Sequence, residues 1–256
     1  MQELKFNPRN APAITTMIQG DPQEGLFTPT VDQQHRLGTG LEDARGRVWR
    51  YAKNGGSELQ RALMAQSEEL KAGLTNEVQT GYTTSIGDTE ITVLVTTGNG
   101  IVDGELRDGY LVTRDGTGSG YMYPIKDNFW ITGDTVMRVH LWEPIRVATA
   151  ATSEFTLVKN LRMDVIVMPT TLTGIAVGVT NGVIAANYYG WLQTKGPCVM
   201  YVDDGDTLVI GEACGAPATH GTAGAVGVVG ATDDVWGRVI DIASDNEYAL
   251  IDLHLE

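Results

Sequence analysis

The sequence predicts an all-β protein, with a barrel or sandwich body, an extended N-terminal arm and at most one short helix. Its 256 residues include 31 glycines, and the apolar residues come in short runs rich in Val, Ile, Thr and Tyr, which favour strands joined by tight turns. Long helical segments that could connect parallel strands are missing, so the sheets should be antiparallel. We expect strands at 89–96, 110–113, 136–141, 155–158, 163–168, 175–179, 198–202, 207–210, 235–242 and 248–255.

The first 36 residues are predicted to be an extended arm, because four prolines exclude a helix interior or a central strand there. A solvated linker would be depleted of apolar residues, but this segment contains several. We therefore expect the arm to become ordered on a surface, either its own body or, as we favour, a neighbouring subunit or shell. The expected contact residues are Phe6, Pro8, Pro12, Ile14, Met17, Ile18, Leu26 and Phe27.

Residues 38–56 predict a β-hairpin with its turn at Asp43 to Gly46. The one helix candidate follows, because Ser57 and Gln60 match a capping box and Leu59, Leu63 and Leu70 recur on one face up to Gly73. A single turn that passes into a strand at 63–66 is the alternative.

Charge is unevenly distributed along the chain. The net charge is −14, yet residues 1–71 contain nine basic and nine acidic residues, so the whole excess follows position 71. An acidic surface repels phosphates, which argues against nucleic-acid partners. No apolar stretch approaches the roughly 20 residues of a membrane span. We expect a soluble protein that is synthesised in a cytoplasm.

Motifs that could carry chemistry have simpler interpretations. The glycines of 116–120 favour a turn, since Tyr121 to Pro124 cannot comfortably open the helix that a phosphate loop needs. Asp204-Gly205 predicts a hairpin between 199–202 and 207–210 rather than a calcium loop. The four histidines lack the spacing of zinc ligands. Cys198 and Cys214 are expected to be buried thiols rather than a disulfide. No cofactor, metal or catalytic residue is predicted.

Five tryptophans could form a sugar-binding platform, but most lie in alternating runs, which favours a place in the core or in a subunit interface. Trp130, beside Phe129, is the best candidate for exposure, and Tyr121 is a second. Carboxylate pairs could serve a glycosidase, although solvated acids at strand ends explain them equally well.

Two blocks of the sequence resemble tailed-phage virion proteins. The first contains Leu37-Gly38-Thr39 and the segment from Gly46 to Gly56. The second runs from Tyr189-Gly190-Trp191-Leu192-Gln193 through Asp204-Gly205-Asp206 and Gly221-Thr222-Ala223-Gly224 to two closing strands at 235–241 and 248–253. This pattern is similar to that of head decoration (cement) and capsid-stabilising proteins.

The resemblance implies a non-enzymatic protein of the capsid exterior that binds the major capsid protein and forms trimers. We expect residues 37–75 and 188–256 to form a barrel-like docking domain, with 76–187 as an inserted β subdomain. Rival hypotheses are a head-fibre or receptor- and glycan-binding module, which would use Trp130 and Tyr121, and a glycan hydrolase. A major capsid protein is less consistent with the sequence. The usual shell fold needs a long spine helix, and the one helix candidate here, Ser57 to Gly73, is too short.

Overall fold

The computed structural model describes residues 18–19, 25–78, 82–95, 100–132, 135–217, 221–230 and 234–256. The chain divides into two compact units. Residues 1–68 and 162–256 form the first unit, and residues 69–161 form the second. The expected inserted segment, 76–187, is therefore longer than the second unit, because residues 162–187 belong to the first.

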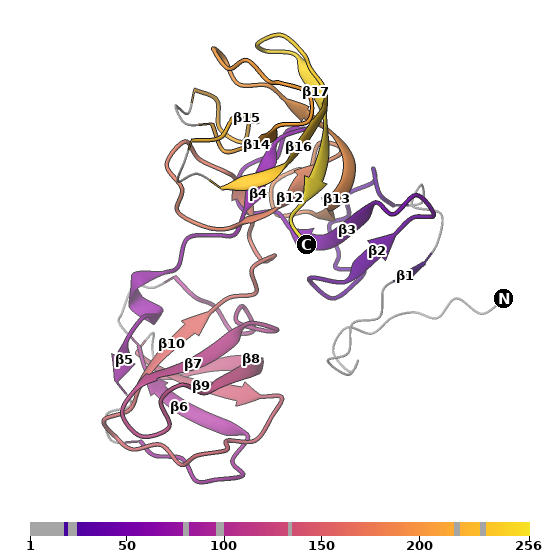
Figure 1. Cartoon of the computed structure of the whole chain (residues 1–256). Helices are drawn as coiled ribbons and strands as arrows, with labels where there is room; N and C mark the ends of the chain where they lie inside the picture. Colours follow the sequence, from indigo (N-terminus) through magenta and orange to yellow (C-terminus); the bar gives the residue numbers. More distant parts are fainter. Residues whose placement is uncertain are drawn as a thin grey trace, which may run out of the picture. The chain divides into compact units, whose positions relative to one another are not determined.

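The all-β prediction is confirmed. The described residues form seventeen strands and one 3-10 turn, η1 (Ala72–Leu74), and Figure 1 shows that the sheets of both units are curled. No helix within the described ranges is long and apolar enough to cross a membrane.

The first unit is an eleven-stranded sheet whose main path runs β1-β2-β3-β13-β17-β16-β14-β15, with β4, β11 and β12 attached beside it. The strands of this unit are β1 (Ile18–Gln19), β2 (Gly40–Glu42), β3 (Val48–Lys53), β4 (Met64–Gln66), β11 (Ile166–Val167), β12 (Ala176–Thr180), β13 (Tyr189–Tyr201), β14 (Ala213–Gly215), β15 (Gly227–Val228), β16 (Val235–Asp241) and β17 (Tyr248–His254).

The long strand β13 organises this sheet. Its first half pairs with β3, and its second half, from Lys195 to Tyr201, pairs with β17. A bulge between Gln193 and Lys195 separates the two halves, and Gly196 there has a φ of 81°, a conformation that favours glycine. The buried Gln193 side chain stabilises the bulge, because its Nε2 donates to the carbonyls of Lys195, Gly196 and Pro197 at 2.9 to 3.2 Å.

The opening hairpin expected from the sequence is present, and the two expected closing strands pair with each other. β2 and β3 pair around the turn at Asp43 to Gly46, and β16 pairs with β17. The opening hairpin and the closing segment share one sheet, since β3 pairs with β13. Two buried clusters lie in this unit: a larger one around Trp236, Met200 and Ile251, and a smaller one around Trp49, Tyr51 and Trp191.

The second unit is a six-stranded sheet in the order β5-β10-β7-β8-β9-β6. Its strands are β5 (Glu77–Val78), β6 (Glu90–Leu94), β7 (Tyr110–Asp115), β8 (Met122–Thr132), β9 (Val136–Leu141) and β10 (Glu154–Val158). β8 pairs with β7 through its first three residues and with β9 from Ile125 onward, so one strand passes from one neighbour to the other. The sheet encloses an apolar core around Phe155, Tyr123 and Ile125.

Two predictions of local structure are wrong. No helix forms at 57–73: Leu59 forms an isolated bridge with Ile184, and the chain enters β4 at Met64, as in the alternative reading. The turn at Asp204-Gly205 is present, but 207–210 is not a strand. Val202 instead bridges Val226, which leaves Val209 and Ile210 exposed. In both cases pairing with distant segments prevails over the local signal.

Candidate functional site

The arm residues predicted to make contacts are only partly described. Phe6, Pro8, Pro12, Ile14 and Met17 lie outside the described residues, and Ile18 is described through its backbone, which pairs in parallel with Leu41 of β2. Leu26 is buried in the smaller cluster of the first unit. Phe27, its neighbour, is 58 % exposed. The described end of the arm therefore packs partly on its own body.

A group of aromatic rings lies where residues 30–35 meet the body. Tyr51 of β3 contacts His35 and Trp191 with ring centroids 5.1 Å away in each case, and it stacks on Tyr189. Its hydroxyl accepts a hydrogen bond from the Gln34 backbone N–H at 3.0 Å. Burial raises the pKa of Tyr51 and lowers the pKa of His35. The cluster fixes the last part of the arm to the sheet.

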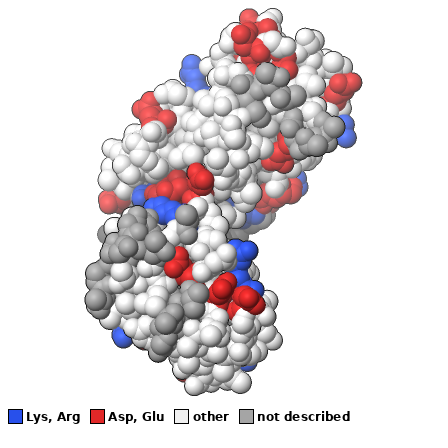
Figure 2. Space-filling view, turned by 90° about the vertical axis from the view of Figure 1, so that its left-hand side faces the viewer, with Lys and Arg blue, Asp and Glu red and all other residues white. Residues whose placement is uncertain are grey.

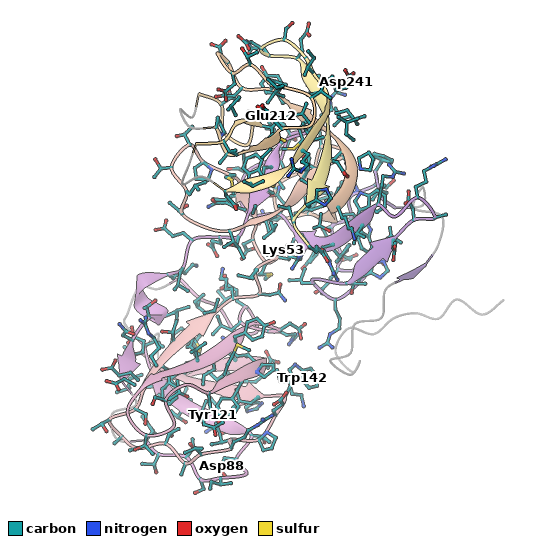
Figure 3. The ribbon with its side chains drawn as sticks, viewed as in Figure 1. Lys53, Asp88, Tyr121, Trp142, Glu212 and Asp241 are labelled. Atoms are coloured by element: carbon teal, nitrogen blue, oxygen red, sulfur yellow. The ribbon has the colours of Figure 1, made fainter. Side chains whose placement is uncertain are left out.

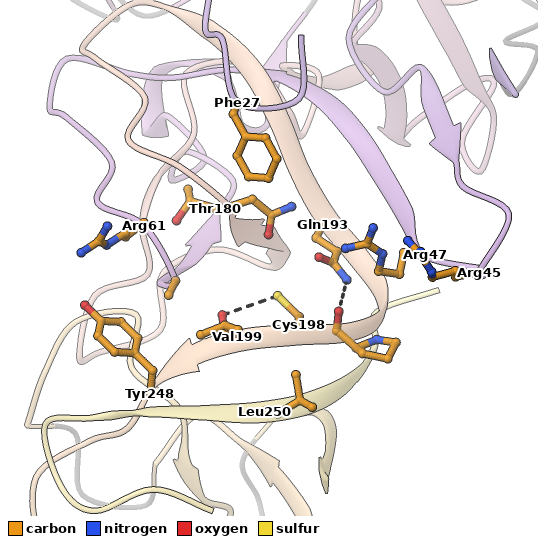
Figure 4. A pocket seen from close by; sticks show the side chains of 13 residues that line it. Phe27, Arg45, Arg47, Arg61, Thr180, Gln193, Cys198, Val199, Tyr248 and Leu250 are labelled. Atoms are coloured by element: carbon orange, nitrogen blue, oxygen red, sulfur yellow. Dashed lines mark hydrogen bonds between the residues drawn. The ribbon is translucent and has the colours of Figure 1, made fainter. Parts of the chain in front are cut away.

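A pocket of about 760 Å³ opens on the first unit (Figure 4). Strands β12, β13 and β17, the turn before β3 and the segments at 27 and 61 all contribute to its lining. Its lining residues are Phe27, Arg45, Arg47, Arg61, Ala62, Thr180, Asn181, Gln193, Pro197, Cys198, Val199, Tyr248 and Leu250. Among these described residues are three arginines and no carboxylate, although the chain carries a net charge of −14.

The arginines of this pocket have different surroundings. Arg47 donates from Nε and Nη2 to Oδ2 of Asp43, both at 2.8 Å, and its guanidinium lies 4.9 Å from the Trp49 ring centroid. Burial opposes ionisation of Asp43, but hydrogen bonds from Arg47 and Arg45 outweigh it and lower the pKa. The exposed guanidinium groups of Arg45 and Arg61 have no ion-pair partner within the described part of the chain.

The floor of the pocket is a continuous, hydrogen-bonded sheet surface. Pro197, Cys198 and Val199 of β13 pair with 250–252 of β17. Cys198 is buried, whereas Val199 and Tyr248 project outward and are 51 % and 49 % exposed. Burial raises the pKa of the Cys198 thiol to about 12. The thiol is therefore protonated at neutral pH, and it contributes apolar surface to the pocket rather than a nucleophile.

The two aromatic residues expected to be exposed differ in their surroundings. Tyr121 is 39 % exposed and stacks on Tyr123 with centroids 6.3 Å apart (Figure 3). Trp130 is half-buried, packs against the core of the second unit and donates from Nε1 to the Ile101 carbonyl at 3.0 Å. The indole N–H of Trp130 is therefore already hydrogen-bonded within the second unit. Three other tryptophans, Trp49, Trp191 and Trp236, are buried, as their alternating runs predict.

The remaining motifs have structural roles in the described residues. Residues 116–120 form a turn with positive φ at Gly116, Gly118 and Gly120. Asp203 is buried and accepts hydrogen bonds from the backbone of Gly221 and Thr222. Cys198 and Cys214 are free and buried, as predicted. His220 lies outside the described residues.

Charge in the first unit is segregated. Residues 33–61 contain six basic and three acidic residues, whereas 203–256 contain eleven acidic residues and one arginine. Lys53 lies at one end of this unit, and Asp241 and Glu212 lie toward the other (Figure 3). Acidic side chains gather at that second end on the face seen in Figure 2. Within the opening hairpin, Arg47 pairs with Asp43, Arg50 with Glu256 and Lys53 with Asp164.

Sequence reasoning missed the arginine-lined pocket. The sequence predicts the turn that holds Arg45 and Arg47, but it places Arg61 in a helix and Tyr248 at the start of a strand. Only the pairing of β13 with both β3 and β17 brings them together. Comparison of this chain with protein-family models, with curated proteins and with solved structures finds no match.

Proposed function

We propose that this chain is a decoration (cement) protein that binds the exterior of a phage capsid and stabilises it, without enzymatic activity, as a homotrimer. The main support for this proposal is that an extended segment pairs with the edge of a sheet. Ile18 and Gln19 of β1 pair in parallel with Leu41 and Glu42 of β2, and Thr30 bridges Tyr189. Addition of an extended segment to a sheet edge is a recurrent mode of protein association.

The packing around Leu26 and Phe27 separates two parts of the arm. Leu26 is buried in the body, so the residues from 25 onward belong to the folded unit. Ile18 and Gln19 pair with β2 of the same chain, so the apolar residues before position 18 are candidates for contact with the shell or a neighbouring subunit. Many weak contacts of this kind on one particle would add up through avidity.

Charge segregation supports association between copies. The basic opening hairpin of one subunit complements the acidic closing segment of another, and such a head-to-tail contact can close into a ring. This is the support for the trimer, and the major capsid protein is the proposed second partner.

The proposal is tested by sedimentation with capsids that lack the decoration protein, taken from the phage that encodes the chain. The full chain and a variant without residues 1–24 are compared, after their masses have been measured by light scattering. We expect both to be folded trimers and only the full chain to sediment with capsids. A monomeric full chain that stays in the supernatant at every concentration would contradict the proposal.

A receptor- or glycan-binding module on the virion surface is the second candidate function. The half-buried Trp130 gives it less support than the sequence suggested, whereas the arginine-lined pocket of the first unit favours it.

A further inference from the structure

We propose that the arginine-lined pocket of the first unit binds a short acidic saccharide, with uronate carboxylates on the arginines and sugar rings on Phe27 and Tyr248. This inference goes beyond capsid binding and does not rest on it. It is carried by the charge and the exposed rings of the pocket.

Charge selects an anion. Arg45 and Arg61 have guanidinium groups without an ion-pair partner in the described ranges, and Arg47 is held in place by Asp43. A guanidinium forms strong, paired hydrogen bonds with a carboxylate. Figure 4 places Arg61 on one side of the pocket and Arg45 with Arg47 on the other. A ligand with carboxylates at two separate points therefore fits better than a single small anion.

The aromatic rings select a ligand with flat apolar faces. Phe27 and Tyr248 are 58 % and 49 % exposed, although each lines the pocket. In Figure 4 both rings border the space above Cys198 and Val199. Large exposed rings beside apolar floor residues offer stacking surfaces that favour the apolar face of a ring-shaped ligand. The volume of about 760 Å³ lies within the usual range for small-ligand sites.

The side chains of the pocket, rather than its backbone, distinguish a saccharide from an acidic peptide. Extended peptides are commonly held by backbone pairing at an open sheet edge. Pro197 to Val199 pair with β17 along one edge of β13, and β3 pairs with the opposite edge only as far as Lys195. The side chains available for recognition are the arginines, the Asn181 amide and the two rings. This set suits a molecule with carboxylates, hydroxyls and ring faces.

The test uses isothermal titration of the full chain with trigalacturonate, which carries one carboxylate on each sugar. The methyl ester of the same trisaccharide is the matched control ligand, because it keeps the rings and loses the charges. We expect saturable binding of the acid and at least tenfold weaker binding of the ester. Added salt should also weaken binding of the acid. Equal binding of both ligands, or no binding of the acid, would overturn the proposal.

Variants locate the site. Arg61→Ala and Arg45→Ala should each weaken trigalacturonate binding about tenfold, through loss of a charge-assisted contact, and Tyr248→Ala should weaken it through loss of stacking. Arg114→Ala is the matched control, because Arg114 is exposed on the second unit. Unchanged melting temperatures exclude unfolding. Equal losses in Arg114→Ala, or tighter binding of an oligo-aspartate peptide than of the saccharide, would contradict the assignment.

A parallel measurement keeps this inference separate from the proposed function. The double variant Arg61→Ala, Tyr248→Ala should sediment with capsids as the natural chain does while failing to bind trigalacturonate. Loss of both activities in this variant would contradict a separate saccharide site.

Discussion

Tyr51 and Tyr189 stack with ring centroids 5.9 Å apart and an angle of 10° between the ring planes. One residue lies on β3 of the opening hairpin and the other begins β13, so the stack joins the opening hairpin to the segment that begins at residue 189. Trp191 and His35 pack on the same Tyr51 ring. The end of the arm, the opening hairpin and this segment therefore share one aromatic cluster.

The hydroxyl of Tyr51 should contribute measurably to stability. Tyr51→Phe removes the oxygen that accepts a hydrogen bond from the part-buried Gln34 N–H. The loss of this bond should lower the free energy of unfolding by about 1–2 kcal/mol. The midpoint of urea unfolding should fall accordingly. Tyr121→Phe is the control, since that side chain is exposed on the second unit. A loss in the control as large as in Tyr51→Phe would contradict this role of the hydroxyl.

Protonation of His35 should destabilise the first unit. Burial lowers its pKa in the folded state below the ordinary 6.5, so the unfolded chain binds this proton at higher pH than the folded chain does. Stability should fall as the pH drops below 6.5 and through the lowered pKa. Urea unfolding between about pH 7.5 and pH 5.5 measures this loss. His35→Phe should reduce it, whereas the exposed His254→Phe should retain it; an identical pH response in all three chains would refute the prediction.

Gly237 is required by close packing of β16 on β17. A Cβ at this position would lie 2.2 Å from the backbone oxygen of Asp252, so Gly237→Ala must move the paired strands, at a cost of about 1–3 kcal/mol. The control is Gly56→Ala, whose Cβ would meet no atom within 4 Å. Thermal unfolding should show a lower transition only for Gly237→Ala. Equal transition temperatures for the two variants would show that this strand pair tolerates a side chain.

Both thiols should be inert in the folded protein. Burial raises the pKa values of Cys198 and Cys214 to about 12, so almost no thiolate exists near about pH 8. Iodoacetamide should label neither cysteine in native protein and both after denaturation, as counted by mass spectrometry. Rapid native labelling of Cys198 would show that the pocket floor is more open than described.

The sequence predicted the fold class and the opening hairpin because their signals are local. Asp43 illustrates this, since its carboxylate accepts hydrogen bonds from the backbone N–H groups of Arg45 and Arg47 within the same turn. Residues 57–66 show the limit. A capping-box pattern predicted a helix, but Leu59 bridges Ile184 and Met64 begins a strand. Those partners are distant in sequence, and no local pattern reveals them.

The candidate site was predicted less well, for the same physical reason. The sequence predicts Phe27 as an arm contact, and this residue lines the pocket. Arg61, Gln193 and Tyr248 come from three separate segments that only the sheet order brings together. Trp130 was expected at the surface because its local segment is bounded by glycine, but its indole N–H donates to Ile101.

The central claim is that the chain occupies defined positions on a capsid. Its most direct test counts the copies bound to each capsid, by quantitative mass spectrometry, as the full chain is added to capsids that lack it. A symmetric shell offers a fixed set of equivalent positions, so binding should saturate at a constant, simple ratio to the major capsid protein. Binding that never saturates, or no binding at all, would contradict a decoration protein.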